Sequence, residues 1–164
     1  MPGILLWYIE TPIGVIRLAQ DDEGICALHF VDSIDASKED SIGASNVEET
    51  PLLHMAAEQL KDYFRGERTA FALPLSYHGT PFQNMVWRAL LTIPYGETRS
   101  YKEIAQAIGN PNAARAVGMA NNRNPISIIV PCHRVIGSNQ SLVGYGGGLD
   151  RKAFLLELEQ QNQD

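Results

Sequence analysis

The sequence predicts an α+β fold, in which a small antiparallel sheet with one helix precedes a mostly helical second half. Short apolar runs separated by turn residues occupy residues 4–31, and a helical repeat of apolar residues follows at 51–65. Two capping boxes, which are sequence signatures of helix starts, lie in the second half. We therefore expect two domains, residues 1–79 and residues 80–164.

The apolar runs at residues 4–9, 15–19 and 25–30 each have the length of a strand. Turn-forming residues separate them, at 11–14 and at 21–24. This pattern predicts a meander of three antiparallel strands.

The polar, aperiodic segment 32–50 is expected to form a surface loop. Apolar residues with the spacing of one helical face come next: Leu53, Ala57, Leu60 and Phe64. They predict an amphipathic helix over residues 51–65, which Gly66 ends.

Thr80 and Gln83 form the first capping box, with Pro81 at the first helical position. The helix that begins there should reach about Thr92. The second capping box, at residues 100–103, opens a short helix expected to end at Ile108, before Gly109.

Asn112 is expected to cap a further helix over residues 113–122. Two short helices joined by a tight turn fit a helix-turn-helix motif, although an ordinary helical hairpin has the same pattern. A short apolar run at 126–130 leads into Cys132. Asp150 should cap a final helix that ends near residue 160.

Composition restricts the class of protein. Hydrophobic residues make up 45% of the 164 positions and charged residues 20%, so the chain can bury a sizeable core and is not disordered. No apolar run approaches the roughly 20 residues that span a bilayer, and the N-terminus lacks the basic region of a signal peptide. We therefore expect a cytoplasmic protein with Cys26 and Cys132 as free thiols.

The net charge of −6 by itself argues against a nucleic-acid ligand. The charge is uneven, however, because residues 84–134 carry six Lys or Arg and only two Asp or Glu. Such a basic segment can meet phosphates locally, although chance can produce the same distribution.

Cys132 is a candidate nucleophile, since it lies between Pro131 and His133 with Arg134 beyond. A neighbouring histidine or positive charge is expected to lower the pKa of the thiol and to favour the reactive thiolate. The alternative is an inert buried cysteine beside a structural histidine.

Glu159 is placed in the last turn of the final predicted helix, where a negative charge opposes the helix dipole. It is either a solvated tail residue or a carboxylate that orients a histidine. Arg115 follows Ala113 and Ala114, small residues that would let a helix approach a DNA groove closely. The alternative is a surface arginine on an alanine-rich helix.

The segment Pro131-Cys132-His133-Arg134-Val135 resembles the active-site motif of the O6-alkylguanine-DNA alkyltransferases. Further matches, in the family's order, are Tyr95-Gly96-Glu97, Ser100-Tyr101, Ala113-Ala114-Arg115-Ala116-Val117-Gly118, Asn124-Pro125, Gly144-Tyr145 with Gly147-Gly148, and Leu155-Leu156 with Glu159. The resemblance is strong from about Thr80 to Glu159. In the N-terminal half only the order of strands and helix is similar to the family's ribonuclease-H-like domain.

The resemblance implies a fold and an activity. The second domain would be a helix-turn-helix, winged-helix-like domain that carries the active site. The protein would repair DNA by direct reversal, taking the alkyl group of O6-alkylguanine, and of O4-alkylthymine, onto Cys132 once per molecule after base flipping.

Catalytic roles also follow from the resemblance. Cys132 would be the nucleophile, His133 would take the thiol proton through a bound water, and Glu159 would orient His133. Tyr101 would hydrogen-bond the flipped base near its N3. Asn124 would be the hinge between the helix-turn-helix and the active-site strand.

Substrate contacts are implied in the same way. Arg115 would fill the gap left by the flipped base, and Ala114 lies in the helix that would enter the minor groove of double-stranded DNA. Val135, Tyr145 and Gly146 would shape the guanine pocket. We expect a monomer that needs no cofactor and does not associate with a membrane.

No metal site is expected. Some relatives hold zinc through two cysteines and two histidines in the N-terminal domain. In this chain Cys26 is the only cysteine there, with His29, His54 and His78 as possible partners, so the set is incomplete. Gly146 stands where many relatives have Ser or Ala, which predicts a roomier pocket.

Two other functions compete with alkyl transfer. A non-enzymatic, alkyltransferase-like lesion-binding protein would resemble this chain but would lack the cysteine at position 132. A cysteine hydrolase would turn over many times and would need an oxyanion hole near Cys132.

Overall fold

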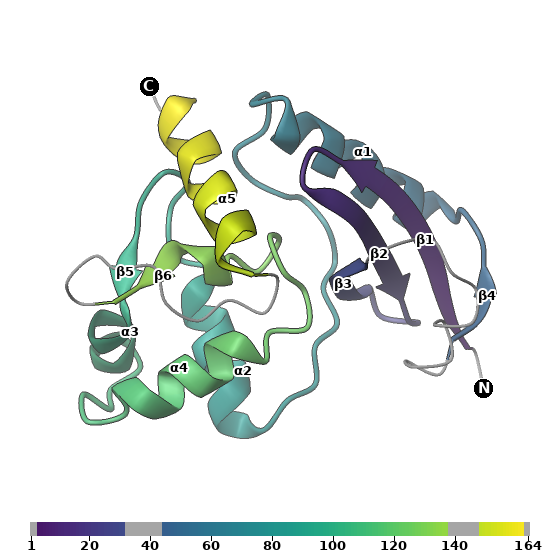
Figure 1. Ribbon diagram of the computed structural model, residues 1–164. Coiled ribbons are helices and arrows are strands. Elements are labelled where there is room, and N and C mark those ends of the chain that lie inside the picture. Colours follow the sequence, from purple (N-terminus) through teal and green to yellow (C-terminus); the bar gives the residue numbers. More distant parts are fainter. Residues whose placement is uncertain (1–2, 32–43, 138–147, 163–164) are drawn as a thin grey trace. The chain divides into compact units, whose positions relative to one another are not determined.

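The computed structural model describes residues 3–31, 44–137 and 148–162. The chain divides into two compact units, Met1–Tyr77 and His78–Asp164 (Figure 1). The first unit contains a sheet and one long helix, and the second is mostly helical, so the predicted α+β fold class is confirmed. Within the described ranges no helix is both long enough and apolar enough to cross a membrane.

The predicted meander forms the centre of the first unit. Its strands are β1 (Ile4–Thr11), β2 (Gly14–Gln20) and β3 (Ile25–Val31), paired antiparallel in sequence order. The register places Leu18 of β2 opposite Leu28 of β3, and both side chains are fully buried. Apolar residues at alternate positions thus give the sheet a buried face.

A fourth strand, β4 (Ala44–Val47), pairs in parallel with β1 and completes a sheet of order β3-β2-β1-β4. The expectation of a loop throughout residues 32–50 is therefore wrong for this segment. The segment lacks the alternation of apolar and polar residues that marks a strand. It is held by backbone pairing at the edge of β1, which a periodicity argument does not detect. Residues 32–43 lie outside the described part of the chain.

Helix α1 (Pro51–Phe64) packs on the sheet (Figure 1). Its N-terminus is capped by Thr50, whose side chain accepts a hydrogen bond from the backbone N–H of Leu53 (3.0 Å). Leu53 and Leu60 are fully buried on its apolar face. Gly66 takes a φ of 76°, a left-handed conformation that suits glycine just after a helix.

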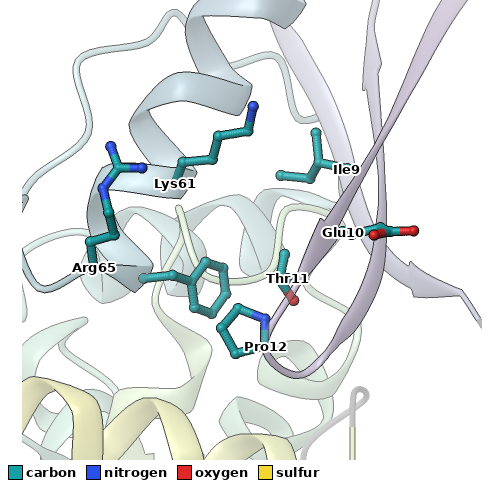
Figure 2. Close-up of a pocket in the computed structure, with 7 residues that line it drawn as sticks. Ile9, Glu10, Thr11, Pro12, Lys61 and Arg65 are labelled. Carbon is teal, nitrogen blue, oxygen red and sulfur yellow. The ribbon is translucent and has the colours of Figure 1, made fainter.

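Figure 2 shows an open pocket between the end of β1 and the last turns of α1. Its lining is Ile9, Glu10, Thr11, Pro12, Lys61, Phe64 and Arg65. Both cations already form ion pairs on the helix surface, Lys61 with Glu58 and Arg65 with Asp62.

The first helices of the second unit begin at the two predicted capping boxes. They are α2 (Pro81–Leu90) and α3 (Tyr101–Ala107). In each helix, the hydroxyl of the N-cap residue accepts a hydrogen bond from the backbone N–H of the third helical residue. The side chain of that third residue accepts one from the backbone N–H of the N-cap residue. The pairs are Thr80 with Gln83 and Ser100 with Glu103.

Helix α4 (Ala114–Asn122) packs against both α2 and α3. The expectation that Asn112 caps it is wrong, because Ala113 occupies the N-cap position and makes no side-chain capping bond. The indole Nε1 of Trp87 in α2 donates to the carbonyl of Ala120 (2.8 Å). This bond holds α2 against the C-terminal half of α4.

The segment between α4 and Cys132 is not the expected strand. Residues 127–129 form a turn, in which Ile128 takes a φ of +71°. A positive φ is unusual for a β-branched residue and indicates local strain. A short parallel pair of strands follows, in which β5 (Arg99–Ser100) meets β6 (Val135–Ile136).

The last helix, α5 (Leu149–Gln161), packs on the turn that begins at Cys132. Gly148 is its N-cap, so the expected cap Asp150 lies instead in the first helical turn. The buried face of α5 carries Lys152, Leu155 and Glu159. This face brings two ionisable side chains into the core of the second unit.

Candidate active site

The backbone of Cys132 is fixed on both sides of the residue. Cys132 opens a single 3-10 turn and is 3% exposed. Its N–H donates to the carbonyl of Val130 (2.8 Å), and its carbonyl accepts from Nδ2 of Asn121 in α4 (3.3 Å). Helix α4 and the candidate nucleophile are thus directly joined.

Asn124 makes a second connection between α4 and this segment. Its Oδ1 accepts from the N–H of Ile126 (3.0 Å), and its Nδ2 donates to the carbonyl of Val130 (2.8 Å). Its side chain also hydrogen-bonds the thiol of Cys132, which favours the thiolate. Asn124 thus connects the end of α4 to the segment that leads to Cys132, as expected of a hinge residue, although this segment forms a turn rather than a strand.

His133 and Glu159 form a buried pair. Nε2 of His133 lies 2.7 Å from Oε2 of Glu159, and the residues are 0% and 1% exposed. The alternative of a solvated tail residue at position 159 is therefore excluded. The helix dipole disfavours a negative charge at this position, and buried hydrogen-bond donors rather than water stabilise the Glu159 carboxylate there.

Within the described part of the chain, donors from Gly96, His133 and Arg134 surround the Glu159 carboxylate. Oε1 accepts from the N–H of Gly96 (3.1 Å) and from Nε of Arg134 (2.9 Å). Oε2 accepts from His133 and from Nη2 of Arg134 (2.9 Å). The Arg134 contact is therefore bidentate, the geometry that gives the strongest arginine–carboxylate pairs.

The electrostatics of the pair define its charge state. Burial alone would raise the pKa of Glu159, but the hydrogen bonds from His133 and Arg134 and the positive charge of Arg134 hold it well below its usual range. Burial lowers the pKa of His133, and Glu159 only partly opposes this, while the charges of Arg134 and Lys152 lower it further. The resting pair is an ionised carboxylate beside a neutral imidazole.

The tautomer of His133 follows from this charge state. An ionised Glu159 can only accept, so Nε2 of His133 must carry the hydrogen. Nδ1 then carries a lone pair. Among the described residues no group hydrogen-bonds this buried nitrogen. His133 is therefore prepared to accept one proton at Nδ1.

The resting state of Cys132 differs from the expectation. The sequence suggested a thiol pKa lowered by its neighbours, but burial raises the pKa of Cys132 to about 11. Hydrogen bonds from Asn124 and the charge of Lys152 oppose burial without overcoming it. The neutral His133 contributes no charge. The candidate nucleophile is thus a protonated thiol at rest, and it would have to lose its proton in order to react.

Lys152 is a buried cation of the site that sequence reasoning missed. It is 0% exposed, and its Nζ donates to the carbonyl of Val135 (2.6 Å). Burial lowers its pKa to about 8, although the charge of a Cys132 thiolate would raise it. No local pattern marks this lysine, because its burial results from the packing of α5 on the turn of Cys132.

Tyr101, the first residue of α3, lies close to the same centre. Burial and the charge of Cys132 raise the pKa of its phenol, while a hydrogen bond with Asn121 lowers it. A Cβ on Gly118 would lie 3.7 Å from the tyrosine ring, so α4 passes directly beside it. The structure thus places Tyr101 near the nucleophile.

The exposed side of α4 carries the candidate DNA contacts. Its exposed residues are Arg115, Ala116, Met119 and Asn122, followed by Arg123 at the C-cap. Ala114 is half-buried, and Val135 is fully buried beside Lys152. Tyr145 and Gly146, which were expected to shape the substrate pocket, lie outside the described residues.

Family models match both halves of the chain. The model described as "6-O-methylguanine DNA methyltransferase, DNA binding domain" matches residues 81–161. The model described as "6-O-methylguanine DNA methyltransferase, ribonuclease-like domain" matches residues 4–77.

Individual proteins are similar over nearly the whole chain. The methylated-DNA–protein-cysteine methyltransferase of Methanosarcina barkeri is 54% identical, over 94% of this chain and 96% of that protein. The constitutive enzyme of that name from Bacillus subtilis is 50% identical, over 92% of each. The crystal structure of Mycobacterium tuberculosis OGT in complex with DNA has a TM-score of 0.85 and 48% identity, over 96% of this chain and 94% of that chain.

Proposed function

Because this chain belongs to the 6-O-methylguanine DNA methyltransferases, we propose that it repairs alkylated DNA by direct reversal, with Cys132 as the alkyl acceptor. One observation carries the choice of residue. Cys132 directly precedes a buried His133 whose Nε2 is held by Glu159 and whose Nδ1 can take a proton. A protonated thiol and a neutral imidazole are the resting pair that general base catalysis requires.

The transfer is an in-line displacement. The thiol proton passes through a bound water to Nδ1 of His133. Sulfur then forms a bond to the alkyl carbon as the bond from that carbon to O6 of guanine breaks. The departing base takes a proton, for which Tyr101 near its N3 is the donor, and leaves as guanine. The thioether is stable to water, so each molecule reacts once.

DNA binds through the exposed side of α4 in the minor groove. The target base is extruded because its reacting atom is inaccessible in the stack. Arg115 then fills the gap, and Ala114 allows the helix to approach closely. O4-alkylthymine is a further substrate of the same pocket. The protein acts as a monomer in the cytoplasm.

Stoichiometry tests this function against both alternatives. With excess duplex containing labelled O6-methylguanine, label transfer should reach a plateau at one methyl group per protein molecule. A hydrolase would continue beyond the plateau and release the label in solution. A lesion-binding protein would bind the duplex and take up no label.

Arg115 should matter for duplex DNA and not for the chemical step. We expect Arg115→Ala to slow repair of O6-methylguanine in a duplex and to leave the rate with free O6-benzylguanine nearly unchanged, because the free base needs no flipping and the exposed Arg115 side chain is not part of the core. Single-turnover rates with the two substrates measure this. Arg88→Ala, on the exposed side of α2, removes the same charge and is the matched control. Equal losses with both substrates would show that Arg115 supports the pocket or the fold.

A further inference from the structure

Arg134 is a buried cation with no role in the displacement itself. It is 6% exposed, and each of its three guanidinium nitrogens donates a hydrogen bond. Nε and Nη2 bind the two oxygens of Glu159, Nη1 donates to the carbonyl of Ile93 (2.7 Å), and its Cζ lies 5.7 Å from the centre of the Tyr95 ring. Such a rigid arrangement fixes the position of the carboxylate and makes the net charge of the Arg134–Glu159 pair close to zero.

The charge matters because Glu159 also holds His133. A buried carboxylate that faces only an imidazole favours the imidazolium, which has no lone pair to accept a thiol proton. A guanidinium on the same two oxygens offsets that negative charge while leaving the hydrogen bond to Nε2 intact. The carboxylate can then orient the ring without holding a second proton on it.

We propose that Arg134 is a positioning residue for the transfer. By offsetting the negative charge of Glu159, it keeps Nδ1 of His133 without a proton and so able to accept the proton that leaves Cys132. This inference rests on the proposed function. Other charged or titratable groups lie around the His133–Glu159–Arg134 cluster as well. Lys152 approaches from α5, Cys132 adjoins it in the same turn, and Tyr95 lies against Arg134 from the segment after α2. The pKa of His133 is lowered by burial and by the charges of Arg134 and Lys152, in agreement with the proposal.

The test is the pH dependence of alkylation of Cys132 by free O6-benzylguanine in Arg134→Met. Without the guanidinium, His133 should stay protonated to higher pH. The rate at neutral pH should fall about tenfold or more, within the roughly 10²–10⁴-fold that general base catalysis contributes, and should recover as the pH rises. A loss of the same size at every pH would mean a merely structural role and would overturn the proposal.

Two variants separate charge from packing. Arg134→Lys retains the positive charge and should recover much of the parent pH profile. The double variant Arg134→Met with Glu159→Gln removes both charges. The acid limb of its pH–rate profile, where the rate falls as the pH is lowered, should therefore return towards that of the parent. An acid limb that stays at the Arg134→Met position in the double variant would contradict the charge argument.

A measurement on the parent protein keeps the proposal testable if Arg134→Met does not fold. Nitrogen NMR of labelled histidine should show His133 neutral at pH 7, with hydrogen on Nε2 and none on Nδ1. An imidazolium at that pH would overturn the proposal. A parent protein that takes no alkyl group on Cys132 would instead refute the proposed function, so the two failures are distinguishable.

Discussion

Cys132→Ser should abolish alkyl transfer and leave binding to duplex DNA unchanged. A serine hydroxyl is a far weaker nucleophile than a thiolate, and a neutral imidazole removes its proton poorly. The substitution preserves the fold because the bonds that fix position 132 come from its backbone N–H and carbonyl. Single-turnover assays with O6-methylguanine duplex and fluorescence anisotropy with the same duplex measure the two properties.

Cys26→Ser is the matched control. Cys26 is half-buried in β3, and its burial likewise raises the pKa of its thiol, to about 11. Its replacement should leave both transfer and DNA binding intact. Transfer that survives in Cys132→Ser but fails in Cys26→Ser would reassign the acceptor.

Glu159→Gln should cause the largest loss of stability. The amide would present N–H donors to groups that are themselves donors, and Arg134 would keep a buried charge without a counter-ion. Removing one partner of a buried ion pair costs about 3–5 kcal/mol, a large share of the roughly 5–15 kcal/mol that stabilises a domain. Urea unfolding should show a lower midpoint, and single-turnover transfer to free O6-benzylguanine should slow as His133 loses its orienting partner.

The pH dependence of this difference has a definite sign. The pKa of Glu159 in the folded protein lies below its unfolded value of about 4.3, so its stabilisation is fully present above that pH. As the pH falls below that value, the parent should lose stability and approach the variant. Glu157→Gln, on the exposed side of the same helix, is the control and should behave like the parent. Equal midpoints for parent and Glu159→Gln at neutral pH would refute the buried ion pair.

Local sequence signals predicted the helices that begin at a capping motif. The starts of α2 and α3 were predicted correctly because each capping box places donors and acceptors within four residues. Where the deciding contact is distant, prediction failed. β4 exists through its pairing with β1. The turns before Cys132 were missed for another reason, because the Asn124 side chain that fixes them is close in sequence but its bonds to the backbone leave no mark in the apolar pattern.

The site shows the same division. The resemblance pointed to Cys132, His133 and Glu159, and the structure brings the last two into contact across 26 positions. It did not point to Lys152, nor to the role of Arg134, because burying a charge depends on how α5 packs on the turn of Cys132. The raised pKa of Cys132 was missed for the same reason. Its neighbours in sequence were known, but its exclusion from water was not.

The most direct test of the central claim is to locate the transferred group by mass spectrometry. The parent protein is incubated with excess O6-methylguanine duplex, digested and sequenced by fragmentation. We predict one methyl group per molecule, on the sulfur of Cys132, and none on Cys26. A methyl group on any other residue, or unmodified protein after the lesion has been repaired, would contradict the account.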